Sequence, residues 1–458
     1  MKSVRAYGVA KYLRAFCLLV CALGAGAAQA AAAHYIVEVT PGTPIDTLAA
    51  KYQFSVIKSS TIPLKVEYSV TTVDQLSGTD LANLLSEPGV LEVETNATVE
   101  CAEEDASSLA SQSLQALGDL LSTHETLQYY GSVVLKTYVN QPGTDRIKLS
   151  DAQTRFGAGS ATVAIIDTGI DLQHPALSGV LVPGYDFTRD RPDTVSELLD
   201  VSAPLGSALQ QSTVELLDSK QFIVALQQST VELLDQVTAA SLNGNSPPAA
   251  FGHGTMVAGL VHLVSPGARI MPLKAFNADG TALIVDVADA IRYAVDHGAD
   301  IISMSFAYAT PSTALESAIA YATSHNVLCI ASAGNAGTET VMYPAGYRKV
   351  IGVGSVDSSD RRSPFSNSGD SVNTAAPGEA LITLFPGGNY AAVWGTSFSS
   401  ALVAGGASLM MSVSPNMTPG VLLQRALDAG SPIDREMEIG RARLDLLRSL
   451  MYLLNPEN

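Results

Sequence analysis

Residues 395–405 have the sequence GTSFSSALVAG, and the rest of the chain is organised around this stretch. Ser397 stands at the entrance of a segment rich in Ala, Ser, Gly and Leu, which predicts the first turn of a closely packed helix. There a hydroxyl lies beside free backbone N–H groups and the positive end of the helix dipole, which favour a nearby negative charge. A serine hydroxyl is a weak nucleophile at neutral pH, so a reactive Ser397 requires a base, a group that orients the base, and a further hydrogen-bond donor.

Length and composition indicate a large globular protein. The chain has 458 residues, enough for one large core beside one or two smaller units. It is 47% hydrophobic and 15% charged, and its net charge of −18 argues against a nucleic-acid partner, because phosphate binding requires clustered Lys and Arg. Cys17 and Cys21 fall in an expected targeting segment, so Cys101 and Cys329 alone provide no disulfide framework.

Residues 1–30 predict a secretory signal peptide. Four basic residues precede an apolar run over residues 15–25, and AQA at residues 28–30 is a small-residue cleavage site. The apolar run is too short for a spanning helix. No other stretch is long and apolar enough to span a membrane, so we expect a secreted or periplasmic protein without a membrane association after signal removal.

Residues 34–100 predict a small α+β module. The expected strands cover residues 35–39, 64–70 and 90–94, and the expected helices cover 43–52 and 81–86. In the segment 101–137, residues 101 to about 135 are rich in Ala, Ser, Leu, Gln and acidic residues and show no clear strand pattern. We expect a partly helical linker there, with a processing site in or near it.

Residues 138–458 alternate between strand and helix patterns, which is typical of an α/β fold with a mostly parallel sheet covered on both faces. The expected strands cover 163–166, 270–276, 301–305, 327–332 and 350–356, and the expected helices cover 253–262, 284–297, 313–324, 397–411 and 419–429. Groups at the ends of such strands gather on one rim of the sheet. Residues at these ends are therefore the candidates for a functional site.

One segment interrupts the alternation. ALQQSTVELLD at residues 208–218 recurs letter for letter at residues 225–235, and a looser echo, TVSELLD, stands at residues 194–200. The copies are too few for a solenoid. We expect a duplicated insertion over about residues 190–248 that forms a surface excursion of short amphipathic helices. A lid or an exosite is the functional alternative to a tolerated insertion.

Three further residues supply what Ser397 requires. Asp167 follows the apolar strand pattern and could orient a base, or merely cap a turn. His253 stands between two glycines at the first turn of a helix, and a reference pKa of about 6.5 suits a base. Asn335 follows another strand and is either an ordinary turn residue or an amide donor to an oxyanion. All four residues fall at junctions that one rim of the sheet would bring together.

In these motifs the chain resembles the subtilisin family of serine proteases, over about residues 138–450. The resemblance rests on DTG at 167–169, HGT at 253–255 and GTS at 395–397, in that chain order. It implies the subtilisin-like three-layer α/β fold. Such a combination of motifs in order is highly specific.

The resemblance assigns a role to each residue of the site. Ser397 would attack a peptide carbonyl, His253 would take and return the proton, and Asp167 would hold the imidazole in the correct tautomer. The Asn335 amide and the Ser397 N–H would stabilise the oxyanion. The expected activity is that of a serine endopeptidase acting on polypeptides.

The resemblance also implies two substrate-binding walls and a pocket floor. The implied residues are Ser303, Ser305, Phe306 and Ala307 on an edge that pairs with extended substrate, Ala331, Ser332, Ala333 and Gly334 on the opposite wall, and Met342 at the floor. Backbone pairing of this kind accepts many sequences, so broad specificity is expected. Met342 would favour an apolar residue before the cleaved bond.

By the same resemblance, the module over residues 34–100 is a propeptide that assists folding and inhibits the enzyme until it is cleaved. The chain departs from the family after the nucleophile, where Phe398-Ser399 replaces Met-Ala and Ala401-Leu402 replaces Pro-His. Ala176 replaces an aspartate of a family calcium site. No cofactor is therefore assigned with certainty, and calcium stays open as an alternative although Ala176 stands at the usual aspartate position.

Two other functions compete with a secreted endopeptidase. A silent peptide-binding relative would keep the fold without a need for Asp167, His253, Asn335 and Ser397 together. An esterase of the α/β-hydrolase type would need Gly-x-Ser-x-Gly, which residues 395–399 lack. Covalent labelling by a fluorophosphonate that is lost in Ser397→Ala would separate an enzyme from a binding protein.

Overall fold

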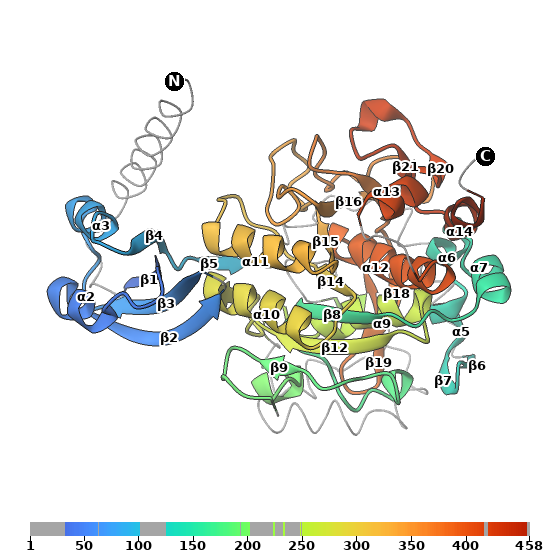
Figure 1. The fold of residues 1–458 in the computed structure, drawn as a ribbon. Coiled ribbons are helices and arrows are strands. Elements are labelled where there is room, and N and C mark those ends of the chain that lie inside the picture. Colours follow the sequence, from blue (N-terminus) through green and yellow to red (C-terminus); the bar gives the residue numbers. More distant parts are fainter. Residues whose placement is uncertain are drawn as a thin grey trace. The chain divides into compact units, whose positions relative to one another are not determined.

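A computed structural model of the chain describes residues 33–62, 64–100, 125–192, 194–201, 223–224, 232–233, 248, 250–415 and 420–455. The expected signal peptide, residues 101–124 of the expected linker and most of the expected insertion lie outside the described residues. The chain divides into two compact units, Met1–Ala97 and Thr98–Asn458 (Figure 1). Thr98–Glu100, expected at the end of the first module, thus belongs to the second unit.

The first unit contains a four-stranded antiparallel sheet with two helices (Figure 1). In spatial order its elements are β2 (Phe54–Ile62), β3 (Lys65–Thr72), β1 (Ala33–Val39) and β4 (Val90–Thr95), with α2 (Ile45–Tyr52) and α3 (Gly78–Leu85) packed on the sheet. Tyr35, Val37 and Val39 alternate on one face of β1 and pack with Leu48 and Leu84 of the helices. This period-two pattern on β1, and the capping box that begins α3 at Ser77, explain the local structure.

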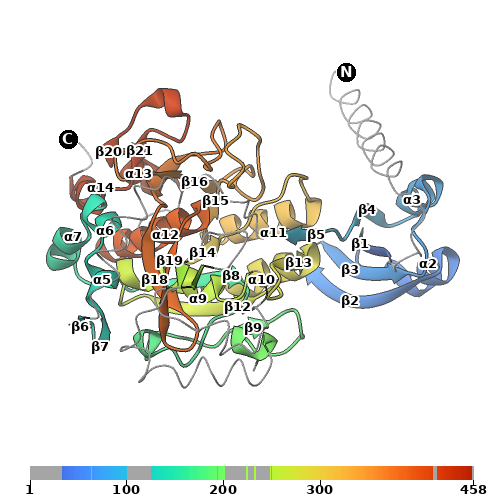
Figure 2. The ribbon, with the colours of Figure 1, turned by 180° about the vertical axis from the view of Figure 1, so that it is seen from behind.

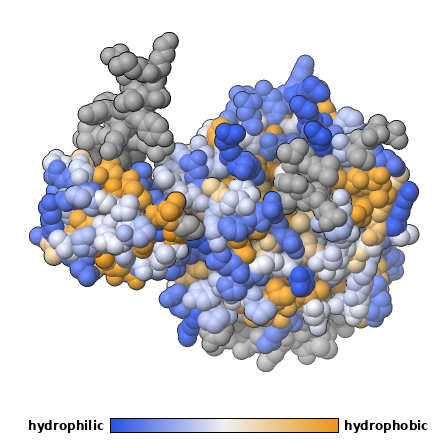
Figure 3. All heavy atoms as spheres, viewed as in Figure 1, coloured by the Kyte–Doolittle hydropathy of each residue, from blue (hydrophilic) through white to orange (hydrophobic). Residues whose placement is uncertain are grey.

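The edge strand β2 was not expected from the sequence. Ser, Lys and Thr interrupt its apolar residues, and most of its side chains are exposed or half-buried. Val56 and Ile57 are among the hydrophobic residues that this unit exposes, and Figure 3 shows several orange areas on its surface. An exposed edge strand needs no apolar alternation, so sequence periodicity fails to identify it.

The second unit is built on a nine-stranded sheet. From one edge to the other its strands are β20 (Ser431–Pro432), β21 (Ala442–Arg443), β17 (Thr374–Pro377), β16 (Val350–Val356), β15 (Leu328–Ser332), β14 (Ile301–Met304), β8 (Thr162–Asp167), β12 (Arg269–Lys274) and β9 (Tyr185–Asp186). All neighbouring pairs are parallel except β20 with β21. The mostly parallel central sheet expected from the sequence is confirmed.

Helices cover both faces of this sheet (Figures 1 and 2). The helices are α5 (Lys136–Val139), α6 (Pro142–Arg146), α7 (Leu149–Phe156), α9 (His253–Val264), α10 (Ile284–Asp296), α11 (Thr313–Ser324), α12 (Thr396–Val413), α13 (Val421–Asp428) and α14 (Leu446–Leu454), with 3₁₀ turns η1 (Pro175–Leu177), η2 (Glu197–Asp200) and η4 (Arg435–Met437). α9 and α12 pack together on one face, and α10 and α11 pack together on the other. Every residue of α9 is buried, which explains why its sequence is apolar on all sides.

Among the described residues, α12 alone is long and apolar enough to cross a membrane by length and composition. The sequence analysis expected no such stretch beyond the signal segment. However, 83% of its apolar window is buried inside the unit. Its hydrophobicity is therefore that of the central helix of a folded core, which passes the same test as a spanning helix.

Three smaller sheets complete the second unit. They are the hairpin β6 (Thr126–Tyr129) and β7 (Ser132–Leu135), the pair β5 (Thr98–Glu100) and β13 (Thr281–Leu283), and a sheet with the order β10 (Ile223–Val224), β11 (Glu232–Leu233), β19 (Asn389–Val393) and β18 (Leu381–Phe385). Within the duplicated copies of the insertion, the described residues are β10 and β11, two strands that extend the β18–β19 hairpin. For these residues, the expectation of amphipathic helices is wrong.

Candidate active site

The four candidate residues lie at the junctions that the sequence analysis identified. Asp167 is the last residue of β8, and His253 is the first residue of α9. Asn335 follows β15, and Ser397 is the second residue of α12. Parallel strands end on one rim of the sheet, which explains how residues so distant in sequence share one region.

A buried hydrogen bond links the first two of these residues. His253 Nδ1 lies 2.8 Å from Asp167 Oδ1, and the two side chains are each only 1% exposed. The Thr168 backbone N–H donates to the same Asp167 oxygen at 2.8 Å. A carboxylate on Nδ1 fixes the imidazole orientation and leaves Nε2 as the nitrogen that can exchange a proton.

The glycine after His253 allows this close contact. A Cβ on Gly254 would lie 1.9 Å from the carbonyl oxygen of Gly169 and 3.2 Å from Asp167 Cβ. The first turn of α9 therefore packs directly against the loop that follows β8. A side chain at position 254 would push these two segments apart.

Ser397 stands on the neighbouring helix. Its hydroxyl donates to the carbonyl of Ser305 at 3.2 Å, and the Ser305 hydroxyl donates to the Ser397 carbonyl at 3.2 Å. The imidazole of His253 lies with its centroid 5.6 Å from the ring of Phe398, the residue after Ser397. The contact between Phe398 and His253 places the start of α12 beside the start of α9.

The Asn335 amide is oriented by Thr396. Asn335 Oδ1 accepts hydrogen bonds from the Thr396 N–H at 2.9 Å and from the Thr396 hydroxyl at 2.8 Å. Because the oxygen is engaged on that side, Nδ2 lies on the other side of the amide, 3.4 Å from the position of a Cβ on Gly395. A donor held in this way beside Ser397 suits a developing oxyanion.

The expected substrate-binding residues fall into two groups. Ser303 of β14 and Ala331 of β15 pair with neighbouring strands on both sides, whereas Ser332 ends β15 and pairs with Val353 of β16. Ser303 and Ala331 therefore offer no free edge, because their backbone hydrogen bonds are used within the sheet. The residues that follow the strand ends are Ser305, Phe306, Ala307, Ala333 and Gly334.

The sequence analysis missed a short strand that does bind an extended segment. β13 pairs antiparallel with β5, with Thr281 opposite Glu100, Ala282 opposite Val99 and Leu283 opposite Thr98. Val99 is buried in this pair. A three-residue strand between a glycine turn and α10 has no periodic signal that sequence reasoning could use.

Met342 lies beside Gly334. Its Cγ is 3.1 Å from the position that a Cβ on Gly334 would take, and its side chain is half-buried. Gly334 has φ +100, a conformation that a residue with a side chain rarely adopts. Met342 is thus next to the second wall, as its expected role at a pocket floor requires.

Ala176 places a methyl group where the resemblance to the family implies a calcium ligand. Ala176 is buried, and its N–H donates to His174 Nδ1 at 3.2 Å. His174 Nε2 in turn lies 3.1 Å from the Asn389 carbonyl oxygen, and burial lowers the pKa of this imidazole. Within the described ranges, no three His, Cys, Asp or Glu side chains are grouped so that they could hold a metal ion.

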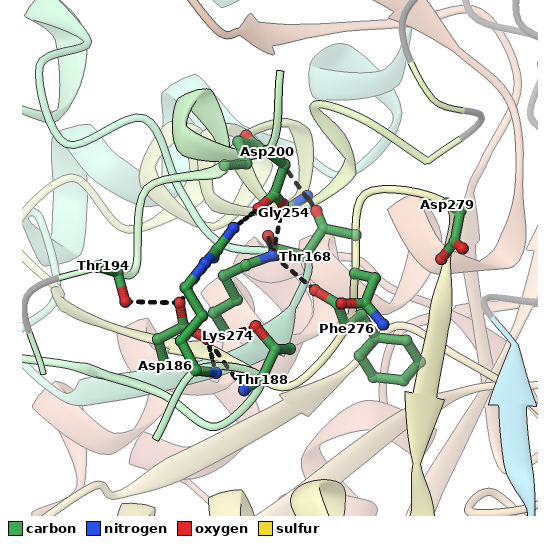
Figure 4. Close-up of polar contacts among 12 residues, drawn as sticks. Thr168, Asp186, Thr188, Thr194, Asp200, Gly254, Lys274, Phe276 and Asp279 are labelled. Atoms are coloured by element: carbon green, nitrogen blue, oxygen red, sulfur yellow. Dashed lines mark hydrogen bonds and ion pairs between the residues drawn. The ribbon is translucent and has the colours of Figure 1, made fainter. Parts of the chain in front are cut away.

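A network of buried and half-buried charged side chains contacts the loop after β8 (Figure 4). Lys274 Nζ donates to the Thr168 carbonyl at 2.6 Å and to Asp200 Oδ2 at 2.7 Å. Arg189 joins Asp200 to Asp186. The sequence analysis missed this network, because its members come from β12, β9 and the turn η2, and no local pattern connects them.

Comparisons with known proteins found a matching family and several relatives. The sequence profile of the subtilase family matches residues 159–429. The thermophilic serine proteinase of Bacillus sp. (strain AK1) is 34% identical over 260 residues, which are 57% of this chain and 54% of that relative. Thermitase from Thermoactinomyces vulgaris is 29% identical over 282 residues, 59% of this chain and 82% of thermitase. The chain thus spans about half the length of the first of these relatives.

A solved structure has the same fold. Fervidolysin from Fervidobacterium pennivorans, described as a keratinolytic enzyme related to subtilisin, superposes with a TM-score of 0.66. The match covers 93% of this chain and 62% of fervidolysin at 20% identity. At this identity the likeness concerns the fold alone.

Proposed function

The chain belongs to the subtilase family, and from this premise we propose that it is a secreted serine endopeptidase made as an inhibited zymogen. The observation that carries the proposal is the buried contact of 2.8 Å between His253 Nδ1 and Asp167 Oδ1, beside the helix that begins at Thr396 and contains Ser397. In the first step Ser397 Oγ attacks the peptide carbonyl and its proton passes to His253 Nε2. The imidazolium then returns the proton to the leaving amine, while Asp167 stabilises its charge.

The tetrahedral intermediate carries a negative oxygen that needs donors. The Ser397 backbone N–H lies in the first turn of α12, where N–H groups lack acceptors within the helix. Asn335 Nδ2 adds a second donor, oriented through the two bonds that Thr396 makes to Oδ1. Water then hydrolyses the acyl-enzyme by the same proton transfers in reverse.

Hydrolysis of a peptide substrate by the purified, processed protein tests this function. A silent binding relative would bind peptides and give no turnover. An esterase would cleave esters and leave peptide bonds intact. Turnover of an unstructured polypeptide, with new N-termini found by mass spectrometry, is the expected result.

The zymogen part of the proposal is supported by the β5–β13 pair. Thr98–Glu100 follows the first unit in sequence and pairs with β13 as an extended substrate would. We propose that residues 34–100 are an inhibitory propeptide and that polypeptide substrates take the place of β5 after processing. The expected signal peptide of residues 1–30 leads to a secreted or periplasmic location. The N-terminal sequence of the exported protein would identify both cleavage points.

Removing the Asn335 amide is expected to slow catalysis strongly without weakening substrate binding. Asn335→Ala deletes one oxyanion donor, and the expected loss is about 10²- to 10³-fold in kcat, the size known for this change in subtilisin. KM should change little, because the donor acts on charge that forms only in the transition state. A rise in KM with unchanged kcat would contradict the assignment.

Removal of calcium with a chelator is expected to leave activity unchanged, because Ala176 stands where the family has a calcium ligand. The buried methyl group and the engaged N–H of Ala176 support this proposal. Activity and Tm, measured with and without EDTA, should agree. A fall in Tm that calcium restores, and that Ala176 variants alter, would show that a site is formed there after all.

Deleting residues 208–235 is expected to leave peptide hydrolysis largely intact. The deletion removes β11 from the outer side of β19, while Asp167 contacts His253 and the Ser397 hydroxyl contacts Ser305, all outside the deleted segment. Activity per labelled active site is the quantity to compare. Loss of this activity with a retained fold would favour a lid or an exosite.

A further inference from the structure

We propose that Glu197 is a positioning residue that holds the Asp167 loop and the first turn of α9 in the geometry of the active pair. This inference rests on the proposed protease function and adds a residue to it. Glu197 begins the 3₁₀ turn η2, within the TVSELLD echo, and it is fully buried. The repeated sequence predicts that this echo belongs to the insertion.

Glu197 contacts both segments at once. Its Oε2 accepts hydrogen bonds from the Thr168 hydroxyl and from the Gly252 N–H, each at 3.0 Å. Its Oε1 lies 3.3 Å from the Thr255 nitrogen and contacts the Thr255 hydroxyl directly. Thr168 follows Asp167, whereas Gly252 and Thr255 flank His253, so one carboxyl group joins the two halves of the pair.

The first turn of α9 depends on this distant residue. A helix usually takes its N-terminal cap from the residue before it, but Gly252 has no side chain and a φ of +92. Instead, Glu197 accepts from Gly252 and Thr255, and the Thr168 hydroxyl accepts from the Gly254 N–H at 3.0 Å. The backbone of His253 is therefore fixed by side chains from the Asp167 loop and η2.

The hydroxyl proton of Thr168 can be donated either to Glu197 or to Asp167. The Thr168 hydroxyl lies 3.0 Å from Glu197 Oε2 and 3.3 Å from Asp167 Oδ1, and it can donate to only one of them. When the Thr168 hydroxyl donates its hydrogen bond to Glu197, Asp167 keeps its hydrogen bonds with the Thr168 N–H and the His253 imidazole. The hydrogen bond between Thr168 and Glu197 thus changes how strongly the negative charge of Asp167, which faces His253, is stabilised.

The turn that carries Glu197 is itself anchored. Three residues after Glu197, Asp200 binds both Lys274 and Arg189, and Lys274 also binds the Thr168 carbonyl (Figure 4). The anchoring holds η2 against the loop that Glu197 contacts. Leu199 of the same turn is 55% exposed and takes no part in these bonds, which makes it a matched control position.

The Glu197 carboxyl group also exchanges its proton within a pH range in which kcat can be measured. Desolvation by burial raises the pKa of Glu197 to about 8, and the charge of Asp167 acts in the same direction. The charged or titratable groups around it are Asp167 on β8, His253 on α9, Lys274 on β12, Asp171 beside Thr255, and Asp200 on η2. Near pH 8, ionisation adds a negative charge that stabilises the His253 imidazolium.

The test compares Glu197→Ala, Glu197→Gln and Leu199→Ala in the full chain, with active sites counted by fluorophosphonate titration. Gln can place its oxygen where Oε2 accepts and its NH₂ towards the Thr255 hydroxyl, so it mimics the protonated acid. We expect Glu197→Ala to lose about 10- to 100-fold in kcat, as positioning defects do, with little change in KM. Glu197→Gln should restore most of this loss at pH 7, and Leu199→Ala should match the wild type.

The pH profile gives a second, independent readout. The wild type should gain kcat through a step near pH 8, and Glu197→Gln should lack this step. Because the folded-state pKa lies above the ordinary 4.5, the folded state holds this proton more tightly than the unfolded chain does. Stability should therefore fall as pH rises from about 5 to about 8, and less steeply in Glu197→Gln.

The outcomes separate the two proposals. An inactive wild type would overturn the protease function itself. An active wild type with folded Glu197→Ala at full kcat, or with equal losses in Glu197→Ala and Glu197→Gln at pH 7, would overturn only the role of Glu197. If Glu197→Ala does not fold, Thr255→Val can replace it, because this variant removes one of the same hydrogen bonds. An unchanged kcat in Thr255→Val, together with an unchanged pH profile in Glu197→Gln, would then overturn the role of Glu197.

Discussion

Ser397→Ala is expected to abolish peptide hydrolysis and to leave the chain as an unprocessed proprotein. The hydroxyl of Ser397 is the proposed nucleophile, and loss of the corresponding serine lowers kcat by about 10⁶-fold in subtilisin. If the chain cleaves its own propeptide, maturation should fail with the same substitution. The mass of the exported protein and its hydrolysis rate, both measured from a protease-deficient host, give the two readouts.

Ser399→Ala provides the matched control for this experiment. Ser399 is buried in the same helix, where its hydroxyl donates to the Pro377 carbonyl at 3.2 Å. Its loss removes one hydrogen bond and leaves the nucleophile in place, so processing should be normal. Normal processing of Ser397→Ala in the same host would show that another protease matures the chain.

Asp167→Asn is expected to lower kcat by about 10⁴-fold while the protein still folds. An amide in this position favours the wrong imidazole tautomer and cannot stabilise the imidazolium. Asn keeps the size of Asp, and its oxygen can still accept from the Thr168 N–H, which lies 2.8 Å from Asp167 Oδ1. Kinetics at several pH values, together with Tm, would separate loss of chemistry from loss of fold.

Asp300→Asn is a suitable control for Asp167→Asn. Asp300 Oδ2 accepts from the Thr162 N–H at 2.8 Å, at the opposite end of the same strand β8. A neutral side chain there retains an acceptor and lies away from the rim that carries His253. Equal losses of kcat in the two variants would contradict a specific role for Asp167.

Sequence reasoning predicted the central sheet and the site for one physical reason. Strands buried on both faces are continuous apolar runs, so β8, β14, β15 and β16 were recognisable without tertiary information. The residues that follow such runs must lie on the rim. That rule predicted the neighbourhood of Asp167 and His253, which the 2.8 Å contact confirms.

What sequence reasoning missed depends on contacts across the chain. β13 is three residues long and gains its role from pairing with β5, about 180 residues earlier in the chain. Glu197 meets Thr168 and Thr255 at sequence separations of 29 and 58 residues. No local pattern marks either feature, because a carboxylate in a polar turn is ordinarily solvated.

The TVSELLD echo shows how a repeat can mislead. Its similarity to the copies at 208–218 and 225–235 suggested a shared surface role. In the fold, Glu197 and Asp200 of the echo are buried or partly buried against the active-site loop, and Leu199 faces solvent. The burial of Glu197 and Asp200 depends on the partners Thr255 and Lys274, which come from elsewhere in the chain and which the repeat does not reveal.

We propose that Asp167, His253 and Ser397 form one reactive site. The decisive experiment is to map the adduct of a fluorophosphonate on the processed protein by mass spectrometry. We expect one adduct, on Ser397, and its near-complete loss in His253→Ala. No adduct on the folded protein, an adduct on another serine, or undiminished labelling in His253→Ala would contradict it.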